Sequence, residues 1–123
     1  MAVYNNFEDL PVWKEAIILA VQIYKITKEE KFKRDYGLSE QIRRAAVSVS
    51  SNIAEGFEKS SRKEFIRSLY IAKGSVSEVR SQIFLSKELG YLDGDFSEKL
   101  LGQTRSLSRQ IGALISFLKK RNL

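Results

Sequence analysis

The sequence contains no cysteine and no histidine in 123 residues, and its single proline is Pro11. Without cysteine there is no disulfide framework, no thiolate nucleophile and no zinc–thiolate site. Without histidine the chain lacks the commonest general base and the commonest transition-metal ligand. A di-iron site of the helical-bundle type is excluded too, because it needs Glu-x-x-His pairs. We therefore expect a protein that is not an enzyme and that binds no metal or cofactor.

Long apolar runs are also absent. The longest, Ala16–Val21, is far too short to span a bilayer, and the first residues, MAVYNNFEDLP, lack the basic and apolar regions of a secretory signal. A hydrophobic content of 43% is too high for a disordered chain. The expectation is a single cytoplasmic domain covering residues 1–123.

The charge is positive and unevenly distributed. The net charge is +6 and the sequence pI is about 9.6, above the value near 9 at which nucleic-acid binding is suspected. Residues 1–60 hold nine Lys or Arg and nine Asp or Glu, whereas residues 99–123 hold six basic residues and no acidic one. Such a regional bias is typical of a basic binding face.

Start and stop signals divide the chain into four helical segments. Pro11 suits a first helical turn, Gly56 predicts a left-handed C-cap, and Gly90 ends the next segment. Ser61-x-x-Glu64 is a capping box, and Asp95-x-x-Glu98 is its acidic analogue. The expected helices lie near residues 9–29, 37–56, 61–89 and 95–121. Because the turns are short, the sequence predicts an all-α, antiparallel up-down four-helix bundle.

Apolar residues recur every three or four positions in each segment, which is the spacing of one helix face. The last two segments carry heptad-like seams of the kind that pack at shallow angles. The predicted core contains Trp13, Ile17, Ile42, Val49, Leu69, Val76, Ile111 and Leu118.

The segment Tyr36–Gly56 has an apolar face wider than one small bundle would bury. Together with the broad apolar face of residues 9–29, this width favours oligomerisation. The residues expected at a subunit interface are Arg43, Val47, Ser50 and Ala54. A charge at Arg43 should then be paired across the subunit boundary or exposed at a ring surface, whereas Arg44 is expected to pair with Glu40 one turn earlier.

The same segment, YGLSEQIRRAAVSVSSNIAEG, carries a resemblance to a known family. It is similar to the signature of the four-helix-bundle proteins encoded in intervening sequences of bacterial 23S ribosomal RNA genes. FEDLPVWKEA (Phe7–Ala16), EFIRSLYIAKGSVSEVRSQ (Glu64–Gln82) and LGYL (Leu89–Leu92) fit as well. Glu29–Lys33 departs from the Phe-Pro that is frequent there. That family resembles in turn the accessory variability protein of diversity-generating retroelements. The resemblance implies a bundle that assembles into a ring, usually a pentamer, with a basic surface.

Basic and aromatic residues alternate along residues 61–89 at steps of three or four. Lysine and arginine on such a stripe neutralise phosphates, and exposed aromatic rings stack on unpaired bases. The alternative is an ordinary solvated helix face. The residues predicted to bind nucleic acid are Arg62, Tyr70, Lys73, Arg80 and Lys87, with Arg105, Arg109 and Lys120 from the last segment.

These observations predict a non-enzymatic homo-oligomer whose basic surface binds RNA, DNA or a nucleoprotein. The rival interpretations are a protein-interaction scaffold, and an adaptor for a reverse transcriptase that makes no direct contact with nucleic acid.

Overall fold

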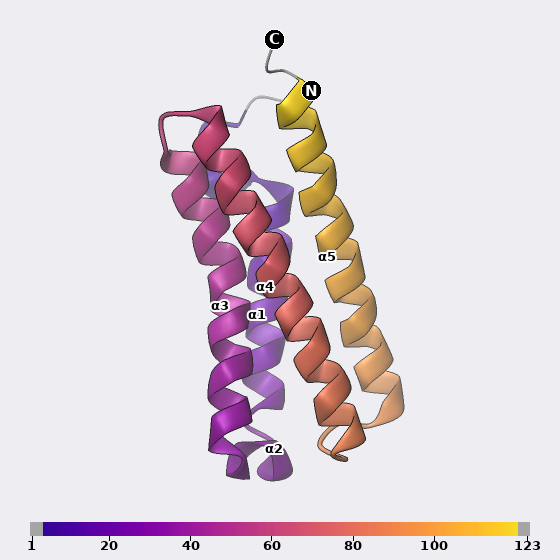
Figure 1. Cartoon of the computed structure of the whole chain (residues 1–123). Helices are drawn as coiled ribbons and strands as arrows, with labels where there is room; N and C mark the ends of the chain where they lie inside the picture. Colours follow the sequence, from indigo (N-terminus) through magenta and orange to yellow (C-terminus); the bar gives the residue numbers. More distant parts are fainter. Residues whose placement is uncertain (1–3, 121–123) are drawn as a thin grey trace.

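The computed structural model describes residues 4–120, which form an antiparallel bundle of four long helices (Figure 1). The long helices are α1 (Pro11–Ile26), α3 (Tyr36–Glu58), α4 (Arg62–Glu88) and α5 (Gly94–Lys120). Two short helices accompany them, the 3-10 helix η1 (Phe7–Asp9) and α2 (Glu30–Arg34). No strand occurs within residues 4–120. The predicted bundle is confirmed, and its assembly into a ring stays a prediction.

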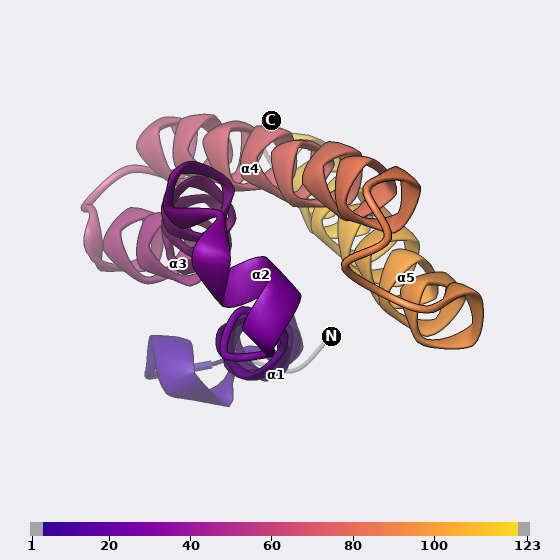
Figure 2. The same ribbon diagram turned by 90° about the horizontal axis from the view of Figure 1, so that it is seen from below.

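The long helices follow one another around the bundle in the order α1, α3, α4, α5 (Figure 2). Each packs against its two neighbours, and α1 and α5 close the circuit. The outer surface along the α1–α3 seam therefore faces away from the outer surface along the α4–α5 seam. No helix in the described part of the chain is long and apolar enough to cross a membrane.

The expected helix over residues 9–29 is shorter in the structure, and the short helix α2 that follows it was not predicted. α1 begins at Pro11 and ends at Ile26, and a turn then leads into α2. The Thr27 hydroxyl donates to the Ile23 carbonyl at 2.9 Å, which occupies an acceptor at the helix end. Phe32 is fully buried and contacts the ring of Tyr91, with 5.4 Å between centroids. Burial of Phe32 thus fixes α2 across one end of the bundle.

Gly56 does not end its helix as predicted. α3 continues to Glu58, and Gly56 lacks the positive φ that a left-handed cap requires. A Cβ atom added at Gly56 would lie 2.5 Å from the Cβ atom of Ser68 on α4. The glycine is needed because α3 and α4 approach closely at this point, which a sequence pattern does not distinguish from a cap.

Both predicted ends of α4 are confirmed. The Ser61 hydroxyl accepts a hydrogen bond from the Glu64 backbone N–H at 3.1 Å. At the other end Gly90 has φ of 78°, and the Tyr91 N–H donates to the Ser86 carbonyl at 2.9 Å. This is a Schellman motif, in which only glycine adopts the left-handed position without strain.

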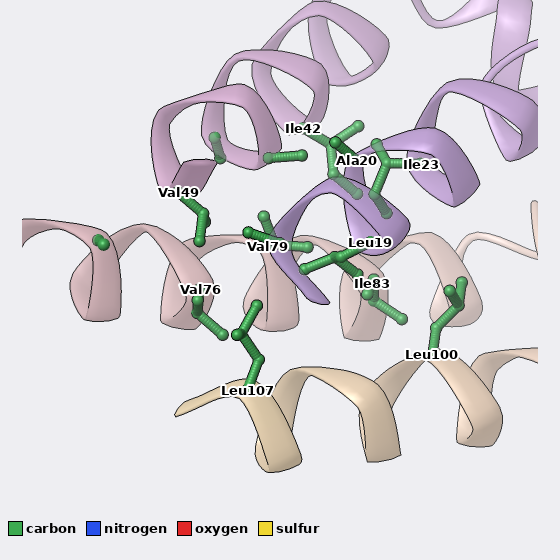
Figure 3. Close-up of a cluster of buried hydrophobic side chains, with 14 of the residues drawn as sticks. Leu19, Ala20, Ile23, Ile42, Val49, Val76, Val79, Ile83, Leu100 and Leu107 are labelled. Atoms are coloured by element: carbon green, nitrogen blue, oxygen red, sulfur yellow. The ribbon is translucent and has the colours of Figure 1, made fainter. Parts of the chain in front are cut away.

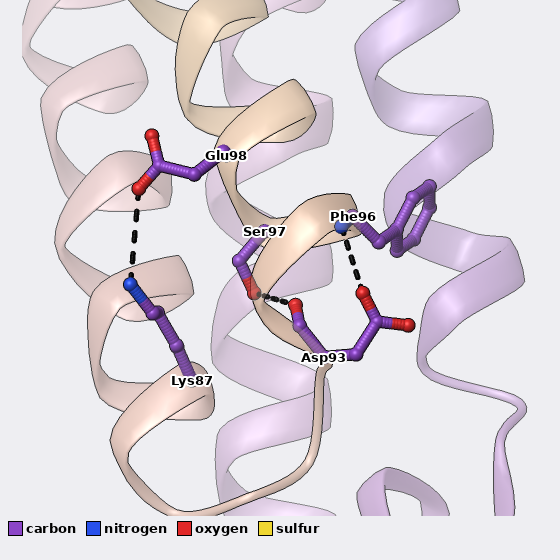
Figure 4. Close-up of polar contacts among 5 residues, drawn as sticks. All are labelled: Lys87, Asp93, Phe96, Ser97 and Glu98. Atoms are coloured by element: carbon purple, nitrogen blue, oxygen red, sulfur yellow. Dashed lines mark hydrogen bonds and ion pairs between the residues drawn. The ribbon is translucent and has the colours of Figure 1, made fainter.

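The cap of α5 is Asp93 rather than the predicted Asp95 (Figure 4). The Asp93 carboxylate accepts from the Phe96 N–H at 2.8 Å, and the Ser97 hydroxyl donates to the Asp93 carbonyl at 2.6 Å. Asp95 lies in the first turn of the helix. There its negative charge is favourable beside the helix N-terminus.

The core is formed by apolar side chains from all four long helices (Figure 3). Of the predicted core residues, five are fully buried: Ile42, Val49, Leu69, Val76 and Ile111. Trp13, Ile17 and Leu118 are only partly buried. Trp13 packs edge-on against Phe7 with 5.3 Å between ring centroids. Trp13 and Leu118 lie near the ends of their helices, where no further layer of a small bundle covers them.

Substitution of Gly56 by alanine should lower the free energy of unfolding by about 1–3 kcal/mol, because the added methyl group overlaps with Ser68. Gly74→Ala is the matched control, since a Cβ atom at Gly74 in α4 meets nothing within 4 Å. That control should gain about 0.5–1 kcal/mol from helix propensity. Urea unfolding measures both. Equal effects of the two substitutions would contradict the close approach of α3 and α4.

The pKa of Tyr91 predicts how stability changes at alkaline pH. Its hydroxyl donates to the Asp35 carboxylate at 3.0 Å. This bond, then burial, then the charge of Asp35 raise the pKa of Tyr91 above 10.0. A phenol whose pKa rises on folding stabilises the fold below its unfolded pKa, and this contribution is lost as pH passes the folded pKa.

Wild-type protein should therefore lose stability more steeply than Tyr91→Phe above about pH 10. Urea unfolding at several pH values compares the slopes, and the two proteins differ only at residue 91. Parallel slopes would show that the Tyr91–Asp35 bond contributes nothing to this dependence.

Candidate nucleic-acid interface

Contacts across the seam between α4 and α5 define the register of the two helices. Lys87 forms an ion pair with Glu98 at 3.7 Å (Figure 4). Fourteen residues further along each helix, about four turns away, the stem of Lys73 lies beside Gly112, with its Cε atom 3.5 Å from an added Cβ. Arg80 is seven residues from both Lys73 and Lys87. Arg105 is likewise seven residues from Gly112 and Glu98, so antiparallel packing places Arg80 and Arg105 at the same level.

Most of the predicted basic residues follow this seam. Arg105, Arg109 and Lys120 are exposed on α5, whereas Lys73 and Arg80 are partly buried on α4. Long basic side chains commonly lay their stems on apolar surface and keep their charges in water. The seam is therefore lined by cations whose positions are set by packing between the two helices.

Two predicted residues differ from this group. Lys87 is partly neutralised by its ion pair with Glu98, at the end of the seam where α5 begins. Arg62 is exposed in the first turn of α4, at the opposite end. The structure thus concentrates positive charge on Lys73, Arg80, Arg105 and Arg109, away from the end of the seam where α5 begins.

Both aromatic residues of the predicted stripe are accessible. Tyr70 is 49% exposed and Phe84 is 43% exposed, so each retains a ring surface on which a base could stack. The Lys119 ammonium donates to the Tyr70 hydroxyl at 2.6 Å and lies 5.0 Å from the ring centroid. Lys119 belongs to this surface although it was not among the predicted residues. Its pairing with Tyr70 joins positions far apart in sequence, and no local pattern reveals it.

The structure leaves only some of the predicted interface residues on the surface. Ser50 is only 7% exposed and its hydroxyl donates to the Val47 carbonyl at 3.1 Å, so it lies inside the bundle and not on a docking surface. Val47 is exposed, and Ala54 is partly exposed. Arg43 is partly buried and contacts Tyr24 of α1 and Thr27, the residue after α1, in its own chain. The other two residues remain candidates for an interface.

The predicted pair of Glu40 and Arg44 is confirmed at 2.8 Å, with both side chains largely exposed. Such a surface pair contributes little stability. Within residues 4–120, no three or more of the acidic side chains lie close enough together to hold a metal ion.

Two comparisons identify proteins that are similar to this chain. The model of the family described as 23S rRNA-intervening sequence protein matches residues 8–113. A crystal structure from Bacteroides thetaiotaomicron VPI-5482, described as a protein with unknown function from the S23 ribosomal protein family, is 25% identical. It has a TM-score of 0.78 and covers 85% of this chain and 97% of its own. No curated protein matches the chain.

Proposed function

The chain belongs to the 23S rRNA-intervening sequence protein family, and on that premise we propose that it is a non-enzymatic protein that binds nucleic acid through the outer face of the α4–α5 seam. The observation that carries the proposal is the register of α4 and α5. It places Arg80 and Arg105 at the same height along the seam, with Lys73 and Arg109 further along it. The acid on this seam, Glu98, is already paired with Lys87. Lys73, Arg80, Arg105 and Arg109 form no ion pair within residues 4–120, so their charges can neutralise phosphates.

Two features of the surface favour single-stranded or structured RNA. Tyr70 and Phe84 offer rings beside the cations, and base stacking on aromatic rings tolerates any sequence. The seam presents helix faces, without a β-sheet platform or zinc module that reads bases. We therefore expect binding that depends strongly on salt and weakly on sequence.

A second proposal concerns self-association. The contact between Thr27 and Arg43 defines the antiparallel register of α1 and α3, which puts Ile17 near the level of Ala54. Ile18 and Val21, on the same half of α1, are each nearly half exposed. Exposed apolar groups near a small residue such as Ala54 favour contact with another copy. We propose that this half of the α1–α3 face forms the subunit interface of a closed ring, with a pentamer as the expected form.

Conversion of Lys73, Arg80 and Arg109 together to glutamate should abolish RNA binding without changing the fold. The matched control converts Lys31, Lys59 and Arg67, which are exposed and belong neither to the predicted basic stripe nor to the face of α1 that carries Ile18 and Val21, so it changes the net charge equally. Fluorescence anisotropy with a labelled RNA across a salt series measures affinity. The wild-type log–log slope should be about −0.7 for each phosphate neutralised on a single strand.

Salt-insensitive binding, or equal losses in the two triple variants, would contradict a specific seam. Absence of binding by wild-type protein would favour the protein-interaction scaffold or the adaptor for a reverse transcriptase.

Replacement of Ala54 by glutamate should dissociate the oligomer while helicity is retained, because a charge would be buried between subunits. Ser81→Glu is the control, since Ser81 is exposed on α4. Sedimentation velocity measures the mass and circular dichroism the helicity. A monomeric wild type at micromolar concentration would refute the proposed interface.

A further inference from the structure

Arg43 is held in a fixed orientation on the side of the bundle opposite the α4–α5 seam. Its Nε–H donates to the Thr27 hydroxyl oxygen at 2.8 Å, and its guanidinium carbon lies 4.7 Å from the centroid of the Tyr24 ring. Thr27 is itself 1% exposed and donates to the Ile23 carbonyl. The hydrogen bond to Thr27 and the cation–π contact with Tyr24 thus orient the planar guanidinium group.

The terminal nitrogens of Arg43 have no partner in the described part of the chain. No carboxylate of residues 4–120 forms an ion pair with it, and its recorded contacts use Nε and the face of the guanidinium. Glu40, less than one turn earlier, pairs with Arg44 instead. Arg43 therefore retains the edge that binds oxyanions through two parallel N–H groups.

The surface around Arg43 is hollowed. One hollow of about 610 Å³ is lined by residues from α1 and α3, and an adjoining hollow of about 400 Å³ reaches α2. Both are lined by Tyr36, Ser39 and Arg43. Lys28 and Lys33 line the second, and neither forms an ion pair within residues 4–120. Arg43, Lys28 and Lys33 thus line the second hollow together, whereas the first also contains the Glu40–Arg44 ion pair.

We propose that the second hollow binds the phosphate monoester of a nucleotide. Arg43 makes the bidentate contact, and Lys28 and Lys33 supply the remaining positive charge. A phosphate monoester carries nearly two negative charges at neutral pH, so it suits three cations better than a single carboxylate does. Tyr36 on the rim is 79% exposed and offers a ring for the base. The size of the hollow lies in the range typical of small-molecule sites.

The site is separate from the α4–α5 seam, since the α1–α3 face lies across the bundle from it (Figure 2). The second hollow also lies toward α2, away from Ala54, whereas the first hollow includes Val47, a candidate interface residue. The same chemistry has two sources, a free mononucleotide and the phosphorylated end of an RNA strand. A carboxylate from a second copy of the chain is the competing occupant of Arg43.

Isothermal titration calorimetry with adenosine 5′-monophosphate, adenosine and inorganic phosphate tests the site. The monophosphate should bind most tightly, phosphate weakly and adenosine least. Arg43→Gln should weaken binding of the monophosphate by about 10- to 100-fold, as expected for loss of a charged hydrogen-bonding group. Arg34→Gln is the control, because Arg34 has an exposed partner in Glu30 and lines neither hollow.

Two further variants separate the geometry from the charge. Arg43→Lys keeps the charge but loses the planar fork, and Thr27→Val removes the acceptor that orients the guanidinium. Both should weaken binding of the monophosphate while thermal unfolding remains cooperative. Unchanged affinity in folded Arg43→Lys and Arg43→Gln proteins would overturn the proposal, as would equal binding of adenosine and its monophosphate.

A short oligouridine carrying either a 5′-phosphate or a 5′-hydroxyl distinguishes the two sources. Preference for the phosphorylated strand over the free nucleotide identifies an RNA end, and the reverse identifies a mononucleotide site. The glutamate triple variant of Lys73, Arg80 and Arg109 should retain binding of the monophosphate, so this test is independent of the α4–α5 proposal. Loss of the oligomer in Arg43→Gln, with no monophosphate binding by the wild type, would assign Arg43 to a carboxylate of a second copy.

Discussion

The close packing of α3 against α4 is the constraint on which the rest of the structure depends. Gly56 faces Ser68 where no Cβ atom fits, and small or polar residues continue the contact. The Ser75 hydroxyl donates to the Ser48 hydroxyl at 3.0 Å. Small side chains let two helix backbones approach, and hydroxyl pairs satisfy the polar atoms that the approach buries. This seam fixes the rotation of both helices about their axes.

That rotation decides which residues reach the two outer faces. With one flank of α4 held against α3, its other flank carries Lys73 and Arg80 along α5. With one flank of α3 held against α4, its other flank carries Arg43 to Thr27 at the C-cap of α1. A single helix-to-helix contact thereby orients both candidate binding surfaces. Disturbance of the α3–α4 seam should therefore affect both faces, whereas charge substitutions on one face should leave the other unchanged.

The bundle was predictable because helical periodicity is a local property, and residues such as Ile42, Leu69 and Ile111 lie where it places them. Local capping signals predict only some of the helix ends correctly. Ser61 caps its helix, but Asp93 and Asp95 are equally plausible caps by sequence, and only the geometry selects Asp93. Gly56 was misread because a cap and a helix contact both require glycine. Contacts between distant segments, such as Lys119 with Tyr70, leave no periodic signal.

The partners of the cations show why the sequence located basic surfaces better than individual sites. Arg44 and Lys87 look like their neighbours in sequence, yet each is paired with a carboxylate of its own chain. Arg43, adjacent to Arg44, has its orientation fixed by neutral groups and its terminal nitrogens left unpaired. A partly buried guanidinium loses hydration without regaining a counter-charge, which is unfavourable unless an anion binds. The physical case for a ligand at Arg43 thus rests on how it is held, which its place in an apolar repeat does not reveal.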